Sequence, residues 1–82
     1  ALSGVMFNQG EVCSAGSRLC VPKKMYDNVM ADLVLYYKKL NQGAGLSPET
    51  TIGPLVYEEQ QKRVMGFIEK GIEEGAEVLC GG

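Results

Sequence analysis

The sequence predicts an α/β fold in the order helix, loop, strand, helix, helix, strand. Two segments carry apolar residues at helical spacing, and two short apolar runs bounded by turn-forming residues are typical of strands. The 82 residues show no internal repeat and no low-complexity segment. Because strands alternate with helices, we expect a layer that contains a parallel pair of strands.

The first half of the chain supplies one strand and one long helix. After an opening helix and a loop rich in glycine and serine, the apolar run 19–21 is predicted as a brief strand that Pro22 ends. Residues 24–40 carry apolar side chains every three or four positions, which predicts a helix. Lys38 and Lys39 lie in its last turn, where the helix dipole favours cations.

The second half begins with a break and ends with a helix and a strand. Gly43, Gly45 and Pro48 prevent the first helix from continuing, so a loop is expected to about residue 55. Residues 58–74 are predicted as a helix, with Gly75 in the left-handed conformation that often follows a last turn. Residues 76–80 are then predicted as the second strand.

Charge and cysteine content restrict the partners and the location. Eight basic and ten acidic residues give a net charge of −2 without clusters, so no nucleic-acid partner is expected. The longest apolar run, residues 33–37, is too short to span a bilayer, so no membrane partner is expected either. Three cysteines without a Cys-x-x-Cys pair predict no disulfide framework and no metal site. Cys20 and Cys80 lie in apolar runs and are expected to be ordinary buried residues. Reduced thiols predict a cytoplasmic protein.

Cys13 is the candidate for chemistry. It follows Gly10-Glu11-Val12 and precedes the small residues 14–17, which would let another molecule approach its sulfur. A thiol attacks carbonyl carbon as the thiolate, and the chain has no histidine to serve as its base. Activation would have to come from backbone dipoles or from a base outside these residues. From the residues alone, a packed loop thiol and a nucleophile both remain open.

This segment closely resembles the active-site motif of the aldehyde dehydrogenase superfamily, in which Gly-[Gln/Glu]-x-Cys carries the catalytic thiol. Here the motif reads Gly10-Glu11-Val12-Cys13. A second block, with residues 51–55 (TIGPL), Gln60 and residues 71–76 (GIEEGA), is similar to the family's segment downstream of the cysteine. The resemblance covers essentially the whole chain.

The resemblance implies that residues 1–82 are part of the catalytic, cysteine-bearing domain, without the dinucleotide-binding and oligomerisation parts. It implies oxidation of an aldehyde to a carboxylic acid, through a thiohemiacetal and a thioester on Cys13, with NAD or NADP as cofactor. The backbone N–H of Cys13 would be one oxyanion donor. The general base and the second donor would lie outside this chain.

Gln60 matches a family glutamine near the ribose of the dinucleotide, so the resemblance implies a cofactor-binding role for it. The implied partners are an aldehyde, the remainder of the same chain and further copies of the full-length protein. The isolated chain is expected to be inactive. Two alternatives stay open: a stand-alone α/β interaction module with an incidental cysteine, and an acylating or semialdehyde-specific member of the superfamily.

Overall fold

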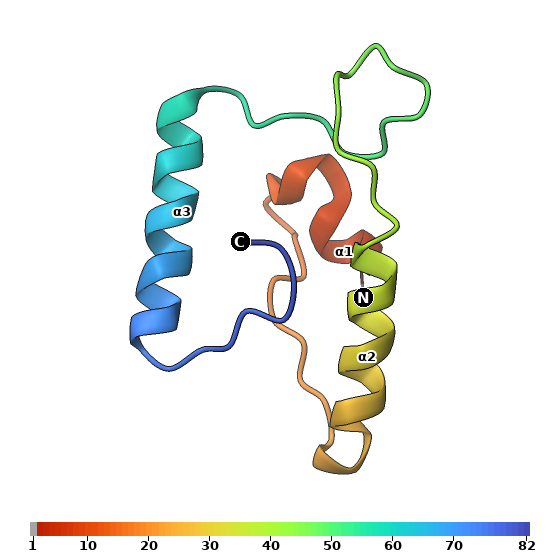
Figure 1. The fold of residues 1–82 in the computed structure, drawn as a ribbon, viewed down its shortest axis with the longest axis vertical. Coiled ribbons are helices and arrows are strands. Elements are labelled where there is room, and N and C mark those ends of the chain that lie inside the picture. Colours follow the sequence, from red (N-terminus) through yellow and green to blue (C-terminus); the bar gives the residue numbers. More distant parts are fainter. Residues whose placement is uncertain (1) are drawn as a thin grey trace.

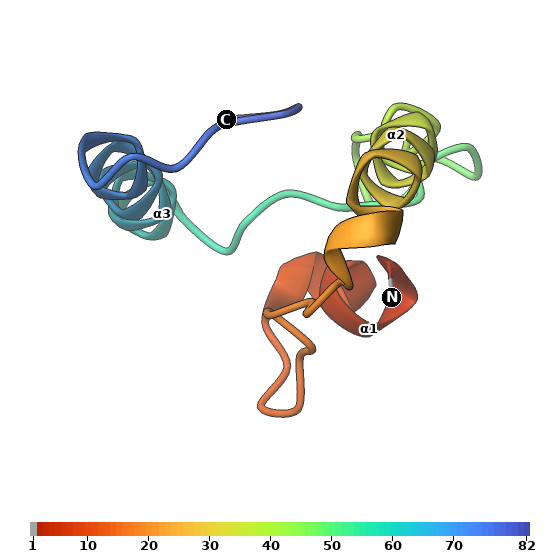
Figure 2. The same ribbon diagram turned by 90° about the horizontal axis from the view of Figure 1, so that it is seen from below.

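The structure, a computed structural model, describes residues 2–82; Ala1, the first residue of the predicted domain segment 1–82, lies outside them. The elements are α1 (Leu2–Met6), the 3-10 turn η1 (Phe7–Gly10), the 3-10 turn η2 (Lys23–Met25), α2 (Tyr26–Tyr37) and α3 (Glu58–Glu73). The helices α2 and α3 stand on opposite sides of the molecule, and the C-terminal segment lies between them (Figure 1). The view from below shows how far α3 is separated from α1 and α2 (Figure 2).

The helix predicted for residues 24–40 is confirmed over its central part. Pro22 precedes η2, and α2 follows directly with Asp27 in its first turn, where the helix dipole favours an acidic group. One face of α2 is half-buried and packs on α1. That face carries Val29, Met30, Leu33, Val34 and Tyr37.

The helix predicted for residues 58–74 is also confirmed, and its end follows from the sequence. Gly75 has φ +97°, its N–H bonds the carbonyl of Ile72 at 3.0 Å, and the Ala76 N–H bonds the carbonyl of Gly71 at 2.9 Å. This pair of bonds is the Schellman motif, which satisfies carbonyls that the last turn leaves free. Within α3, Glu58 and Lys62 form an ion pair at 2.7 Å, one helical turn apart. The guanidinium of Arg63 lies over the ring of Phe67.

The order helix, loop, strand, helix, helix, strand is not confirmed, because residues 19–21 and 76–80 form no strand. The pairing within residues 2–82 is a single isolated parallel bridge between Gln42 and Ile52. A strand exists only when a neighbouring strand accepts its hydrogen bonds. Neither predicted segment has such a neighbour among the described residues, so their apolar side chains alone do not produce a sheet.

The loop after α2 is closed at its neck by hydrogen bonds. The carbonyl of Asn41 accepts from the backbone N–H groups of Thr51 and Ile52 at 2.9 and 3.0 Å. The hydroxyl of Thr51 accepts from the Asn41 N–H at 2.6 Å. This neck fixes where the chain leaves the loop and enters residues 53–57, which lead to α3.

Residues 3–82, whose side-chain burial the structure describes, contain no buried hydrophobic core. The accessible surface is 7041 Å², about half as much again as the roughly 4,800 Å² expected of a compact protein of this mass. The radius of gyration of 13.9 Å likewise exceeds the roughly 11.7 Å expected for this length. Large apolar side chains therefore face outward, among them Leu35, Tyr36, Phe67 and Ile72. No described helix meets the length and apolarity needed to traverse a bilayer.

Candidate active site

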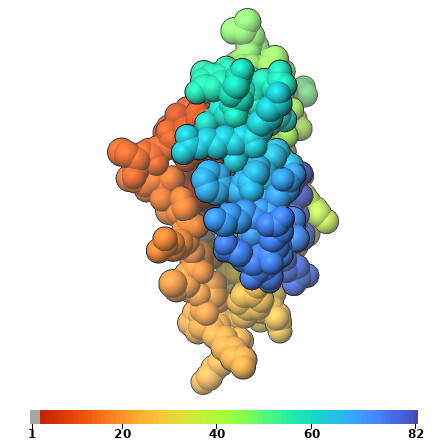
Figure 3. Space-filling model, turned by 90° about the vertical axis from the view of Figure 1, so that its left-hand side faces the viewer, coloured from red at the N-terminus to blue at the C-terminus, as the bar shows by residue number. Residues whose placement is uncertain are grey.

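Cys13 lies in a tight turn of the loop that follows η1. The N–H of Ala15 donates to the carbonyl of Val12 at 2.9 Å, which closes a β-turn with Cys13 and Ser14 at its centre. Both central residues are exposed. The space-filling view shows this segment, in orange, at the molecular surface (Figure 3). Within the described residues, the Cys13 thiol is therefore open to solvent.

A left-handed turn directly precedes the cysteine motif. Asn8, Gln9 and Gly10 have φ of 49°, 58° and 79°. Asparagine and glycine adopt this region readily, but glutamine does not, and a non-glycine residue there costs about 1–2 kcal/mol. Two hydrogen bonds from Glu11 and Asn8 close the turn: Glu11 N–H to Asn8 O at 2.9 Å and Asn8 Nδ2 to Glu11 O at 3.5 Å. Such strain persists only where surrounding contacts hold it.

Gly10 is required for both conformation and space. Besides its positive φ, a Cβ at this position would lie 3.2 Å from the carbonyl oxygen of Val5. On the other side of Cys13, the N–H of Gly16 donates to the carbonyl of Gly4 at 2.8 Å. The loop is thereby fastened to α1 after the cysteine, and before the cysteine its backbone passes close to the carbonyl of Val5.

Gln9 connects the cysteine segment to the second sequence block. The amide orientation that satisfies its surroundings turns Oε1 toward Gly53, whose N–H it accepts at 3.2 Å. Nε2 then donates to the carbonyl oxygen and Oδ1 of Asn8 at 2.9 and 3.1 Å. Gln9 and Gly53 are both half-buried. Sequence reasoning missed this contact, because nothing in the Asn-Gln-Gly signal for a turn reveals a partner far along the chain.

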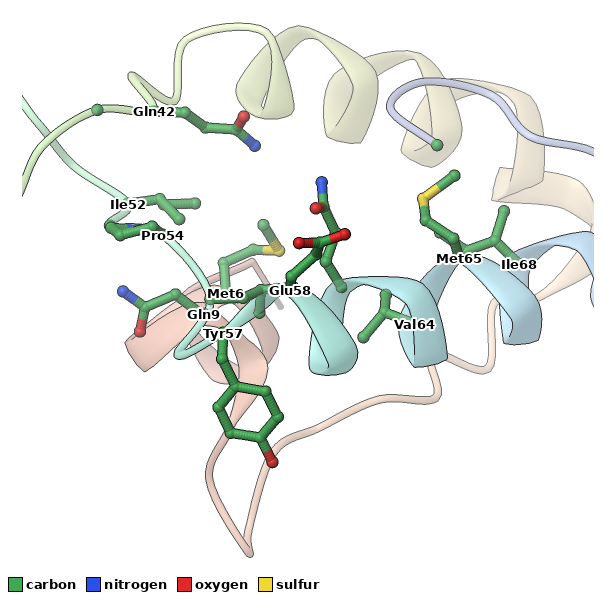
Figure 4. Close-up of a pocket in the computed structure, with 15 residues that line it drawn as sticks. Met6, Gln9, Gln42, Ile52, Pro54, Tyr57, Glu58, Val64, Met65 and Ile68 are labelled. Atoms are coloured by element: carbon green, nitrogen blue, oxygen red, sulfur yellow. The ribbon is translucent and has the colours of Figure 1, made fainter.

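The Gln9 contact lies at one end of a cavity of about 790 Å³ between α1, residues 52–55 and α3. Figure 4 shows Gln9 beside Pro54 and Ile52, with Val64, Met65 and Ile68 of α3 toward the other end. Neither Cys13 nor Gln60 lines this cavity. The structure of residues 2–82 therefore does not bring the two sequence-predicted site residues into one pocket.

Gln60 is half-buried near the start of α3. Arg63, one turn further along, is exposed. An amide and a guanidinium are donors that suit ribose hydroxyls or phosphate oxygens, so their chemistry fits the implied dinucleotide.

The other two cysteines do not share the environment that the sequence predicted. Cys20 and Cys80 lie in apolar runs, which favoured buried thiols, yet Cys20 is exposed and Cys80 only half-buried. The prediction of a buried Cys20 is wrong because no element of residues 2–82 covers this run. No group of three metal-ligating side chains is found within the same residues.

The comparisons with known proteins agree with the resemblance carried by the cysteine motif and by the second sequence block. The model of the aldehyde dehydrogenase family matches residues 1–82. The chain belongs to the aldehyde dehydrogenase family.

Similarity to individual relatives extends over the whole chain but only part of each relative. The chain is 54% identical to the Bacillus subtilis (strain 168) protein DhaS over 82 residues, 100% of this chain and 17% of that protein. It is 45% identical to betaine aldehyde dehydrogenase of the same organism, with the same coverage. Against phenylacetaldehyde dehydrogenase of Pseudomonas fluorescens the identity is 38%, covering 100% of this chain and 16% of that enzyme. The chain thus spans about one sixth of these relatives.

A solved structure shows the same arrangement. A mutant of aldehyde dehydrogenase from Bacillus cereus matches with a TM-score of 0.90 and 47% identity, covering 94% of this chain and 16% of that one. The spatial arrangement of α2 and α3 is therefore similar to that of the matching segment in this aldehyde dehydrogenase structure.

Proposed function

We propose that this chain is the cysteine-bearing segment of an NAD(P)-dependent aldehyde dehydrogenase and that Cys13 is its nucleophile. The observation that carries the proposal is the Cys13 turn, exposed and closed by backbone hydrogen bonds, in a chain that matches the family along its whole length. The high similarity to a segment of a complete enzyme supports a role within a longer protein.

The chemistry requires covalent capture because an aldehyde has no leaving group. The Cys13 thiolate forms a bond from sulfur to the carbonyl carbon, and the carbonyl electron pair moves to oxygen as an oxyanion. The backbone N–H of Cys13 is the donor that this segment offers to that oxygen. A nicotinamide cofactor, when bound, would supply the hydride acceptor. Loss of hydride leaves a thioester on Cys13, and water then releases the carboxylic acid and restores the thiol.

The residues around Cys13 suit this sequence of steps. Ser14 and Gly16 are small and exposed, so substrate can approach the sulfur without displacing a bulky side chain. Glu11, two residues before the thiol, is exposed. We assign it no base role, since the family motif also accepts the neutral glutamine. The Gln60 amide, with Arg63 one turn along, is our candidate for holding the cofactor.

The test is a pair of substitutions in the full-length enzyme. Cys13→Ser should retain the fold but lose aldehyde oxidation by a factor on the order of 10³ or more, because an alkoxide is far harder to generate than a thiolate. Cys20→Ser, the matched control at the other exposed thiol, should keep most of the activity. Near-normal turnover by Cys13→Ser would refute the proposal.

Product analysis in the same assay separates the proposed reaction from the acylating alternative. Free carboxylic acid as the product, formed without a second thiol substrate, supports hydrolysis of the thioester. Strict dependence on an added acyl acceptor thiol would instead assign this chain to an acylating member of the family.

A further inference from the structure

Three consecutive left-handed residues bring the chain into the cysteine motif, and the middle one is the least suited to that conformation. Gln9 has φ 58°, between Asn8 and Gly10, which tolerate positive φ better. A glutamine keeps this strained conformation only where contacts with its surroundings hold it there. The structure supplies them through its own side chain.

In the amide orientation assigned above, the Gln9 side chain bonds two segments that lie far apart in the sequence. Nε2 donates to the carbonyl oxygen and Oδ1 of Asn8, within the left-handed turn, and Oε1 accepts from Gly53 N–H at 3.2 Å. One side chain therefore stabilises the turn and fastens it to residues 51–55. The Thr51 and Ile52 N–H bonds to Asn41 anchor those residues in turn.

Gly53 is the residue that makes room for this contact. A Cβ at Gly53 would lie 2.7 Å from the end of the Gln9 amide, so any larger residue would push the amide away. Together with the Gly16–Gly4 bond on the far side of Cys13, the Gln9–Gly53 contact gives the cysteine turn one anchor on each side.

We propose that Gln9 is a positioning residue. Through its contact with Gly53, it holds the Cys13 thiol and backbone N–H in the position and orientation that the reaction requires. This inference rests on the proposed function of Cys13. Displacement of a reacting group by a fraction of a bond length or more lowers the rate of the chemical step without removing substrate binding. The expected signature is thus a loss in kcat rather than a rise in KM.

The experiment measures kcat, KM and Tm in the full-length enzyme, with kcat expressed per Cys13 thiol that iodoacetamide alkylates, counted by mass spectrometry on the peptide that carries Cys13. Gln9→Ala should lower kcat by about 10- to 100-fold while KM for aldehyde changes by less than about threefold. Gln9→Asn accepts the left-handed conformation more readily but is too short to reach Gly53, and it should show the same loss. Should Gln9→Ala fail to fold, Gln9→Asn carries the test. Gln61→Ala, which removes the same kind of side chain from the other wall of the cavity, should change kcat by less than about twofold.

A double-substitution cycle tests the contact itself. Gly53→Ala should lower kcat by displacing the amide, and in a Gln9→Ala background it should add little, because the group it displaces is already absent. The proposal is overturned by losses that multiply in the double variant, by wild-type kcat in Gln9→Ala, or by wild-type kcat in Gln9→Asn. Any of these results would leave the proposed role of Cys13 as nucleophile standing. An active Cys13→Ser enzyme would instead refute the proposed function, and with it the role of Gln9.

Discussion

At the residue scale, the cysteine motif depends on backbone conformations that few side chains can adopt. Gly10 has a φ of +79°, and a Cβ added to it would lie 3.2 Å from the Val5 carbonyl oxygen. The motif glycine is therefore explained by the turn that precedes the thiol as well as by access to the sulfur. Its role is to let the chain reverse immediately before Cys13.

Gly10→Ala should accordingly damage the turn. In the full-length enzyme we expect a free-energy loss of about 1–2 kcal/mol from the positive φ alone, with a further loss from the close approach to Val5. Gly45→Ala is the matched control, since a Cβ added there would meet nothing within 4 Å and its φ is not positive. Urea denaturation and turnover of both variants provide the comparison; equal stability and activity in the two would contradict this account of Gly10.

The residue scale also shows what the sequence could and could not predict of the site. The Cys13 segment could be singled out from the sequence because the motif and the small residues after it are contiguous; its role as nucleophile stays a prediction. The Gln9–Gly53 contact was not, because it depends on how residues 51–55 return to the cysteine turn. The half-buried environment of Gln60 agrees with either a structural or a cofactor role, so its assignment stays a prediction.

At the element scale, the helices were predictable and the strands were not. The signals for α2 and α3 are local: apolar spacing, Pro22 before the first helix and Gly75 after the second. A strand requires a hydrogen-bonding neighbour that no local signal provides. Residues 19–21 and 76–80 therefore carry apolar composition without forming a sheet in the described part of the chain.

Two glycines of α3 give opposite predictions for the same substitution. Gly66 lies in the exposed middle of the helix with nothing within 4 Å, so Gly66→Ala should stabilise α3 by about 0.5–1 kcal/mol. Gly75 has φ +97° in the Schellman motif, so Gly75→Ala should destabilise the helix end by about 1 kcal/mol. Far-UV circular dichroism of the 82-residue chain should show helicity rising in the first and falling in the second. Changes of the same sign would show that the helix termination is misassigned.

At the scale of the whole molecule, the described residues bury too little apolar surface to stabilise a folded domain. None of the described residues forms a buried core, and α3 packs on no other helix of residues 2–82. The TM-score of 0.90 against a segment of a complete enzyme explains this shape, because the remaining five sixths of such an enzyme can cover the exposed apolar side chains.

The isolated 82-residue chain should therefore unfold without a cooperative transition and bind the dye ANS. Hydrophobic burial supplies most of the favourable free energy of folding, and this chain retains little of it. Thermal scans followed by circular dichroism provide the measurement. A sharp, reversible transition of the monomer would show that the chain is a self-sufficient domain, as the interaction-module alternative requires.

The same chain should show no NAD(P)-dependent aldehyde oxidation. Under the proposed function it holds the nucleophile Cys13 and one oxyanion donor, and the other positioned groups that the reaction needs are expected elsewhere in the enzyme. A steady-state assay with purified chain and full-length enzyme side by side tests this. Oxidation by the 82 residues at a rate within about a hundredfold of the whole enzyme would contradict it.

The central claim, that Cys13 forms the covalent intermediate, is tested most directly by trapping that intermediate. The full-length enzyme is acid-quenched during turnover of a slow aldehyde substrate, digested and examined by mass spectrometry. The account predicts an acyl adduct on the peptide that carries Cys13, and none on the peptides with Cys20 or Cys80. An adduct on either of those cysteines, or turnover at full rate with Cys13 always unmodified, would contradict it.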